Sequence, residues 1–222
     1  MKTIALVPAR KGSVRLPNKN RMKLAGQPLI EWTIKFAKKL KFIDDIIVST
    51  NDKRIINYIK KYRGIKIFVR SENLSRAETK TEDVVLDVVK KYETRFKKIN
   101  TILLLQPTSP FRSMKKVHFA YKKYNYYNKL NSIISVSKTS NPAKKFYKIK
   151  KNKLVNLNKN ENNKFKYQIN GNFYFISPVF LKKYKSFFHE NNTCPVILNS
   201  KPYSIDIDTK KDFKMAERIL IR

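Results

Sequence analysis

The sequence predicts an α/β fold in which helices cover both faces of a mostly parallel sheet. Short apolar segments rich in β-branched residues alternate along the chain with segments whose apolar residues recur at helical spacing, and the connections between them are short. The chain has 222 residues, enough to bury a substantial core, and no segment has the composition of a linker. We therefore expect one domain over residues 1–222, with at most an inserted subdomain.

Five short apolar segments are predicted to be strands of this sheet, at residues 4–7, 46–49, 66–69, 102–105 and 132–136. A helix is predicted between the first two of them. Pro28 is well placed to open this helix, because proline is favoured in the first helical turn. The residues Ile30, Thr33, Ile34, Ala37 and Leu40 then recur at the spacing of one buried face.

Two further helices carry sequence signals at their ends. Asp52 is predicted to cap the helix that runs through residues 55–59, and Gly64 to end it, as glycine often does. Thr79 and Glu82 stand three residues apart just before the apolar series of residues 84–89. This spacing predicts a capping box at the start of the next helix.

The alternating pattern changes after residue 137. The stretch of residues 144–163 is rich in lysine and asparagine and contains two short alternating segments, FYKIK and KLVNL, which we interpret as a projecting hairpin within a subdomain around residues 138–170. Regular structure is expected again in the apolar run 173–176 and in a helix starting near Pro178. A last strand and helix are predicted over residues 203–221.

The chain is strongly basic, with 50 Lys and Arg against 16 Asp and Glu and a formal net charge of +34. Such a charge, with tyrosines interleaved among lysines in residues 121–129, raises the possibility of nucleic-acid binding. The alternative is a genome-wide compositional bias toward Lys, Asn and Ile, which we favour because the lysines are spread along nearly every predicted helix. We expect no specific nucleic-acid partner.

No segment of the sequence has the length and hydropathy of a signal peptide or of a membrane-spanning helix, so a cytoplasmic protein without a membrane partner is expected. Cys194 is the one cysteine and is interpreted as a structural thiol, since it has no internal partner. His118 and His189 are expected to be structural or solvated. No spacing of serine, histidine and acid suggests a covalent nucleophile.

The first motif that carries chemistry is TIALVPARKGSVRLPNKN at residues 3–20, where a buried strand leads into a basic loop. The cations of this loop are Arg10, Lys11, Arg15 and Lys19. Gly12 and Ser13 allow backbone N–H groups to turn toward a phosphate. The loop matches neither the P-loop nor the dinucleotide-binding pattern, so on its own it indicates only an anion site.

The second motif is LLLQPTSPFR at residues 103–112, where an apolar strand ends at Gln106. Pro107 and Pro110 stiffen the backbone, so that Gln106 and Thr108 emerge at the carboxyl end of a strand. Open α/β sheets bind ligands at that edge. The amide of Gln106 has both a donor and an acceptor for a base or a sugar.

The third motif is SIDIDTKKDF at residues 204–213. Asp206 and Asp208 alternate on a predicted short strand and should project to the same face. Two like-facing carboxylates suit a cation such as Mg²⁺ beside substrate phosphates. Asp212 is predicted to lie in the first turn of the last helix, where a carboxylate is favourable.

Taken together, the three motifs resemble those of the acylneuraminate cytidylyltransferases, also called CMP-sialic acid or CMP-nonulosonic acid synthetases. ARKGSVRLPNKN, LLLQPTSPFR and SIDIDTKKDF are similar to the motifs of this family and occur in the same order over nearly the whole chain. The resemblance implies a Rossmann-like nucleotidyltransferase that joins CTP to a nonulosonic sugar acid with Mg²⁺ assistance and releases pyrophosphate. It also implies a role in surface polysaccharide biosynthesis.

The resemblance also implies the roles of individual residues. The implied catalytic residues are Arg10, Lys19 and Asp208, and the implied metal ligands are Asp206 and Asp208. The residues implied to bind CTP are Arg10, Ser13, Arg15, Lys19, Asn20 and Thr81. Those implied to bind the sugar acid are Gln106, Thr108, Lys144, Asn170 and Tyr174, the last two from the segment QINGNFYF.

The chain departs from the family pattern at two places. Val14 stands where many members have lysine, with Arg15 next to it, and the arginine that members use toward the sugar carboxylate is missing, with Lys144 its best-aligned replacement. SVRLPNK is also similar to a motif of the KDO cytidylyltransferases, so an eight-carbon acid is the alternative substrate. Asn20 and LLLQPTSPFR fit the sialic acid group better.

Two further expectations concern partners and function class. Members of the family dimerise through the projecting hairpin, so the resemblance implies a homodimer. A hypothesis from a different class is a basic nucleic-acid-binding protein that keeps a nucleotide-binding fold without its activity, motivated by the +34 charge.

Overall fold

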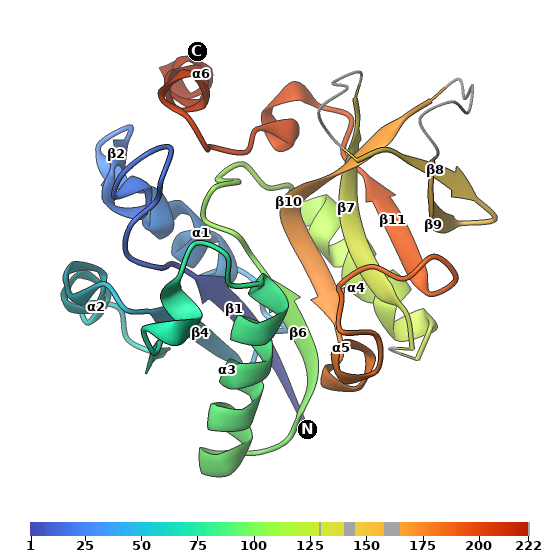
Figure 1. The fold of residues 1–222 in the computed structure, drawn as a ribbon, viewed down its shortest axis with the longest axis horizontal. Helices are drawn as coiled ribbons and strands as arrows, with labels where there is room; N and C mark the ends of the chain where they lie inside the picture. Colours follow the sequence, from blue (N-terminus) through green and yellow to red (C-terminus); the bar gives the residue numbers. More distant parts are fainter. Residues whose placement is uncertain (129, 140–144, 158–164, 222) are drawn as a thin grey trace.

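The computed structural model describes residues 1–128, 130–139, 145–157 and 165–221, and it has the expected α/β architecture (Figure 1). The main sheet has the strand order β11-β7-β10-β6-β1-β4-β5, and β10 also pairs with the β8–β9 hairpin. Neighbouring strands along this order are parallel, except where β10 pairs with β6 and with β7. The prediction of a mostly parallel sheet is confirmed.

The elements have the following bounds. The strands of the main sheet are β1 (Lys2–Pro8), β4 (Asp45–Thr50), β5 (Ile65–Val69), β6 (Ile99–Leu104), β7 (Ser132–Lys138), β8 (Tyr147–Lys150), β9 (Lys153–Asn156), β10 (Tyr167–Ile176) and β11 (Thr193–Ile197). The helices are α1 (Leu29–Lys38), α2 (Lys53–Ile59), α3 (Thr81–Arg95), α4 (Met114–Tyr126), α5 (Pro178–Tyr184) and α6 (Lys210–Ile221). Short 3₁₀ helices are η1 (Lys19–Arg21), η2 (Asn73–Ser75) and η3 (Lys201–Ser204), and β2 (Lys23–Leu24) pairs with β3 (Gln27–Pro28).

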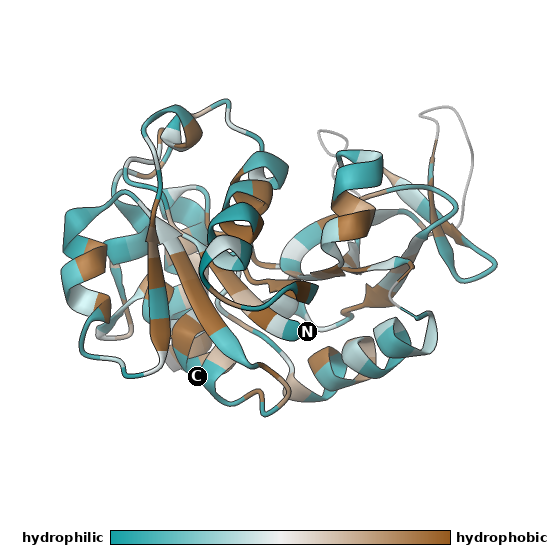
Figure 2. Cartoon of the chain, turned by 90° about the horizontal axis from the view of Figure 1, so that it is seen from below, coloured by the Kyte–Doolittle hydropathy of each residue, from teal (hydrophilic) through white to brown (hydrophobic). Residues whose placement is uncertain are grey.

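Helices cover both faces of the sheet, as predicted. In β1 the side chains of Ala5 and Val7 pack into the cluster that contains buried residues of α1, α2 and α4. Ile4 and Leu6 point the other way and pack with α3 and α5. The central strands are therefore buried on both sides, and Figure 2 shows their hydrophobic colouring between helices whose outer surfaces are hydrophilic.

Of the signals predicted at the ends of α2 and α3, one was right and two were wrong, whereas α1 begins directly after Pro28 and α5 begins at Pro178, as predicted. Asp52 caps α2 and accepts hydrogen bonds from the backbone N–H groups of Arg54 and Ile55. Gly64 does not end that helix; α2 ends at Ile59, and Gly64, at a φ of +82°, closes the turn before β5. The Thr79–Glu82 capping box is absent, because Thr79 Oγ1 donates instead to the Asn73 carbonyl at 3.1 Å and α3 begins only at Thr81.

The segments FYKIK and KLVNL form the antiparallel β8–β9 hairpin, which the sequence predicted. It attaches to β10, a longer strand than the predicted run of residues 173–176. The pairing of β10 with β7 is interrupted between Ile169 and Tyr174, and Gly171 within this interruption has a φ of +73°. Residues 170–172 therefore leave the regular ladder.

The C-terminal part departs from prediction in two elements, the first being β11, which was not predicted. The last predicted strand is wrong, since residues 201–204 form η3 and residues 205–208 are irregular. The prediction of a first-turn cap at Asp212 is confirmed: its carboxylate accepts from the Thr209 N–H at 2.8 Å, and the Asp212 N–H donates to Thr209 Oγ1 at 3.2 Å. Cys194 is buried in β11. Among the described residues, no helix has the length and hydropathy needed to cross a bilayer.

Candidate active site

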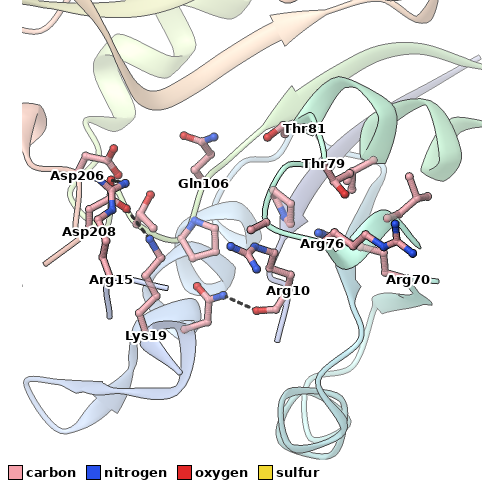
Figure 3. Close-up of a pocket in the computed structure, with 17 residues that line it drawn as sticks. Arg10, Arg15, Lys19, Arg70, Arg76, Thr79, Thr81, Gln106, Asp206 and Asp208 are labelled. Atoms are coloured by element: carbon pink, nitrogen blue, oxygen red, sulfur yellow. Dashed lines mark hydrogen bonds and ion pairs between the residues drawn. The ribbon is translucent and has the colours of Figure 1, made fainter. Parts of the chain in front are cut away.

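A cavity of about 410 Å³ lies at the carboxyl ends of β1 and β6, the edge at which the sequence motifs were expected to meet (Figure 3). Its walls come from the loop after β1, from η1, from the connection between β5 and α3, and from residues 106–108 and 206–208. The polar side chains of its lining are Arg10, Arg15, Lys19, Asn20, Arg70, Arg76, Thr79, Thr81, Gln106, Thr108, Asp206 and Asp208. Residues from all three motifs thus line a single cavity.

The cavity is predominantly cationic. Its basic side chains are Arg10, Arg15, Lys19, Arg70 and Arg76, and its acidic side chains are Asp206 and Asp208. Charges of one sign inside a walled hollow reinforce one another, and they favour a polyanion over a neutral ligand. A triphosphate is a ligand of that kind.

Apolar contacts and contacts to the backbone fix the conformation of the loop after β1. This conformation therefore does not depend on ion pairs of the loop's cations. Leu16 is 2% exposed and packs into the cluster that joins the loop to α6. Asn20, in η1, is 9% exposed, and its side-chain amide donates to the Arg10 carbonyl at 3.4 Å. Gly12 has a φ of +72°, a conformation that suits glycine. Ser13, predicted to bind CTP, does not line the cavity.

Asp208 lies at one end of the cavity and is paired with two cations. Lys19 Nζ donates to Asp208 Oδ1 at 2.7 Å and to the Ile207 carbonyl at 3.1 Å, and Arg15 Nη2 donates to Asp208 Oδ2 at 2.6 Å. The Lys19 side chain is 15% exposed and that of Arg15 68%, so the contact with Lys19 is the better shielded of the two. The two cations most closely tied to the carboxylate therefore come from the first motif.

The segment that carries the two aspartates is positioned by backbone contacts. The Ile207 N–H donates to the Thr108 carbonyl at 2.8 Å, which joins the third motif to the second. Asp212 Oδ2 accepts from the Asp208 N–H at 3.2 Å. Although the predicted strand is absent, Asp206 and Asp208 both line the cavity, as the prediction of a common face required. Among the described residues, no cluster of three or more His, Cys, Asp or Glu could hold a metal unaided.

Sequence reasoning missed Arg70, Arg76 and Thr79, which complete the wall opposite Asp208. Arg70 is 6% exposed; its guanidinium donates to Ser49 Oγ at 3.2 Å and to the Ser49 carbonyl at 2.9 Å. Burial, with the nearby charge of Arg10, lowers the pKa of Arg70 to about 10. Arg70 follows directly after β5 and so lies, like Gln106, at the carboxyl end of a strand, where ligands of α/β sheets bind.

The predicted sugar-binding residues do not all reach the cavity. Gln106 and Thr108 line it. Asn170 is 4% exposed and does not; its Oδ1 accepts from Ser135 Oγ at 2.7 Å and from the Asn172 N–H at 3.2 Å. Tyr174 is 8% exposed and packs on Phe187, with ring centroids 5.2 Å apart.

Burial, and then the charge of Asp206, raise the pKa of Tyr174, so its hydroxyl stays protonated at neutral pH. Lys144 lies outside the described residues.

Comparison with known proteins identifies the family. Residues 4–219 match the family described as Cytidylyltransferase. The chain is 34% identical to the CMP-N,N'-diacetyllegionaminic acid synthase of Legionella pneumophila over 99% of this chain and 97% of that protein. It is 27% identical to the N-acylneuraminate cytidylyltransferase of Escherichia coli, of whose length it spans about half: 97% of this chain matches 51% of that protein.

A solved structure agrees at the level of the fold. A CMP:2-keto-3-deoxy-manno-octonic acid synthetase complexed with CTP superposes with a TM-score of 0.81 over 100% of this chain and 99% of that one, at 16% identity. This likeness shows a shared nucleotidyltransferase fold. The family match, which extends over almost the whole chain, confirms the resemblance on which the three motifs agree. The chain belongs to the cytidylyltransferase family and is a nucleotidyltransferase of the N-acylneuraminate cytidylyltransferase type.

Proposed function

We propose that this chain joins CTP to a nonulosonic, sialic-acid-like sugar acid and releases pyrophosphate. The observation that carries the proposal is the single cavity in which cations of the first motif, amide and hydroxyl groups of the second and carboxylates of the third meet. Relatives named as synthases of CMP-diacetyllegionaminic acid and as cytidylyltransferases of N-acylneuraminate and pseudaminic acid support this substrate class. The family also favours an enzyme over a basic nucleic-acid binder.

The cationic wall supplies the triphosphate site of the proposal. Arg10, Arg70 and Arg76 line the cavity with no carboxylate within ion-pair distance among the described residues, so their charges remain available to phosphate oxygens. Arg15 and Lys19 are bound to Asp208 and would exchange it for phosphate when the nucleotide enters. Thr81 adds a hydroxyl donor to the same wall.

The reaction needs little covalent chemistry from the protein. The anomeric hydroxyl attacks the α-phosphorus of CTP and loses its proton to solvent water, while the bond between the α-phosphorus and the α,β-bridging oxygen breaks and its electron pair leaves with pyrophosphate as negative charge. Arginines and Lys19 placed along the phosphates would stabilise that charge, since cations positioned in advance need no reorganisation as the charge develops. Gln106 offers a donor and an acceptor that orient the attacking sugar acid.

Mg²⁺ fits the residues present. Asp206 and Asp208 provide carboxylate oxygens at one end of the cavity, and Mg²⁺ in nucleotide sites is held by one or two carboxylates together with substrate phosphates and water. The lack of a third acidic ligand among the described residues agrees with a site completed by the substrate. When bound, the ion would act as a Lewis acid toward phosphate oxygen.

A pyrophosphate-release assay tests the proposal. Purified protein is incubated with CTP, Mg²⁺ and each of four acceptors, namely N-acetylneuraminic, legionaminic, pseudaminic and KDO acids. We expect turnover with at least one nine-carbon acid and none without acceptor. Turnover with KDO alone would move the protein to the eight-carbon class, and the absence of turnover with all four would contradict the proposal.

We further propose a cytoplasmic homodimer whose CMP-sugar product supplies surface polysaccharide biosynthesis. The β8–β9 hairpin extends the sheet at β10 and offers a surface for a second copy of the chain (Figure 1). The chain has a mass of 26.3 kDa, and light scattering coupled to gel filtration should give twice that value. A monomer at micromolar concentration would contradict the dimer.

A further inference from the structure

Arg112 lies beside the cavity without lining it, and its guanidinium joins three elements. Nε donates to the Asn172 carbonyl in β10 at 2.9 Å, and Nη1 donates to Thr33 Oγ1 in α1 at 2.9 Å. Nη2 donates to the Gln106 carbonyl, just beyond β6, at 2.6 Å. A planar fork of donors is needed to meet three acceptors that lie in different directions.

Arg112 has no carboxylate partner among the described residues. All three of its acceptors are uncharged. Its guanidinium also lies over the ring of Phe36, 5.8 Å from the centroid. Burial lowers the pKa of Arg112 to about 9. A cation retained where desolvation disfavours it indicates that the geometry of its donors matters.

The contacts of Arg112 lie where β10 leaves its ladder. A backbone carbonyl that loses its sheet partner needs another donor, and Arg112 supplies one to Asn172. Two more bonds fasten the same segment to the second motif: Ser109 Oγ donates to the Asn170 carbonyl at 3.3 Å, and Asn172 Nδ2 donates to the Phe111 carbonyl at 2.6 Å.

The Gln106 side chain passes directly over Gly171, between these contacts. A Cβ on residue 171 would lie 2.4 Å from Gln106 Oε1, closer than a real Cβ contact permits. The Gln106 side chain thus packs against the backbone of β10 at Gly171, while the backbone carbonyl of Gln106 accepts a hydrogen bond from Arg112. Both constraints act on one residue of the cavity lining.

We propose that Arg112 is a positioning residue that fixes the side-chain amide of Gln106 against Gly171 for contact with the acceptor sugar acid, a role that rests on the function proposed above. Arg112 itself touches no substrate. Lysine would keep the charge but has a single nitrogen, which cannot bridge Gln106, Asn172 and Thr33 in this geometry.

Arg112→Lys is the first test. We expect it to raise KM for the acceptor by about tenfold, because small displacements of an orienting group are costly, and to leave KM for CTP within about twofold. Arg95→Lys is the control, since Arg95 also lies over an aromatic ring, 5.9 Å from the centroid of Phe68, but is exposed at the end of α3 and does not line the cavity. That variant should match the wild type in both constants.

A double-mutant cycle with Gln106→Ala distinguishes positioning from a merely structural role. If Arg112 acts through Gln106, Arg112→Lys should change acceptor KM by less than about twofold once the amide is gone. Gly171→Ala, which displaces the same amide from the other side, should also raise acceptor KM and should be equally silent in the Gln106→Ala background. It provides the test if Arg112→Lys does not fold.

The proposal is overturned if the effects of Arg112→Lys and Gln106→Ala multiply, or if Arg112→Lys changes only the unfolding temperature. It is also overturned if KM for CTP rises as much as KM for the acceptor. Wild-type turnover on the acceptor panel is measured first. Its absence contradicts the proposed function, whereas turnover with multiplying effects contradicts only the role of Arg112.

Discussion

The two sides of the cavity are built on different physical principles. The proposed nucleotide side consists of the cations Arg10, Arg15, Lys19, Arg70 and Arg76. On the proposed acceptor side, Gln106 lines the cavity and the β10 segment of residues 170–172 lies behind it, where neutral amides and carbonyls are held by a network of hydrogen bonds. Coulomb attraction falls slowly with distance, whereas a hydrogen bond is lost within a fraction of an ångström. The nucleotide side should therefore tolerate small displacements that the acceptor side does not.

The largest expected effect is at Asp208. Asp208→Asn removes the charge that pairs with Arg15 and Lys19 and half of the proposed metal site. We expect Mg²⁺-dependent kcat to fall by about 10³-fold or more, because metal-assisted charge stabilisation is worth several kcal/mol. Pyrophosphate release measured over a Mg²⁺ titration checks this.

Asp87→Asn is the matched control for that variant, since Asp87 is also a partly exposed aspartate paired with a lysine, at 2.7 Å from Lys91, but lies on α3 outside the cavity. It should retain full activity. Wild-type Mg²⁺ dependence in Asp208→Asn would remove the metal assignment, provided that circular dichroism shows an intact fold.

The next largest effect is expected on acceptor KM when Gly171 is replaced by alanine, and the same substitution at Gly64 is its control. Both glycines have positive φ, +73° and +82°, so replacement by alanine strains either backbone by about 1 kcal/mol. Only at residue 171 would the new Cβ meet Gln106 Oε1, at 2.4 Å; at residue 64 nothing lies within 4 Å. We expect Gly171→Ala to raise acceptor KM about tenfold and Gly64→Ala to leave it unchanged.

Urea unfolding and steady-state kinetics on these two variants separate strain from displacement. Equal losses of unfolding free energy with unequal acceptor KM would support a geometrically constrained acceptor side. Equal KM values in the two variants would show that the contact between Gln106 and residue 171 has no consequence for the acceptor.

A smaller effect is expected from ionic strength, which should change KM for CTP more than KM for the acceptor. Raising the salt concentration from about 0.05 to about 0.5 M shortens the screening length several-fold and should raise KM for CTP by several-fold, because its site is cationic. KM for the acceptor, which we propose is oriented by neutral groups, should change by less than about twofold. Initial rates over a matrix of both substrates at each salt concentration measure this, and parallel changes would contradict the distinction.

The smallest expected effect concerns stability behind the cavity. Glu31 in α1 is 5% exposed and accepts hydrogen bonds from the Tyr58 and Tyr62 hydroxyls. Burial alone would raise the pKa of Glu31, but these bonds and the nearby Lys35 lower it from 4.5 to about 2. Because the folded-state pKa lies below the unfolded one, this contribution to stability is present above pH 4.5 and is lost as the pH falls toward 2.

Urea unfolding between pH 5 and pH 3 checks this pH dependence. In that interval the free energy of unfolding of the wild type should fall by on the order of 1 kcal/mol more than that of Glu31→Gln. Glu78→Gln is the control at an exposed glutamate and should follow the wild type. Since α1 also carries Thr33, a partner of Arg112, acceptor KM in Glu31→Gln shows whether the acceptor side depends on the placement of this helix.

The same comparison explains how much the sequence could predict. Strands such as β1 and β4 were predicted correctly because short, apolar, β-branched runs between turns are typical of buried strands. The cations of the first loop and the aspartates near the C-terminus were found because their motifs are local. Strand β11 was missed because Pro195 lies within it, and proline is tolerated there since β11 is an edge strand.

What could not be predicted depends on contacts between distant segments. Whether Asn170 faces the cavity or the Ser135 hydroxyl is decided by the interrupted register of β10, and no local signal reports a register. Arg112 is the last residue of the second motif, but its acceptors are 6, 60 and 79 residues away along the chain. The Thr79–Glu82 pattern was satisfied in sequence, but the Asn73 carbonyl competed for the threonine hydroxyl.

The direction of β10 has a consequence for how such enzymes diversify. Because β10 is antiparallel to β6 and β7, it begins at the edge of the sheet where the cavity lies, and the β8–β9 hairpin pairs with that end of it. Insertions and substitutions in residues 138–166 can therefore accumulate without shifting the strands that hold the cations. We therefore expect that exchanging residues 138–166 between relatives would change the sugar specificity and leave the nucleotide site unchanged.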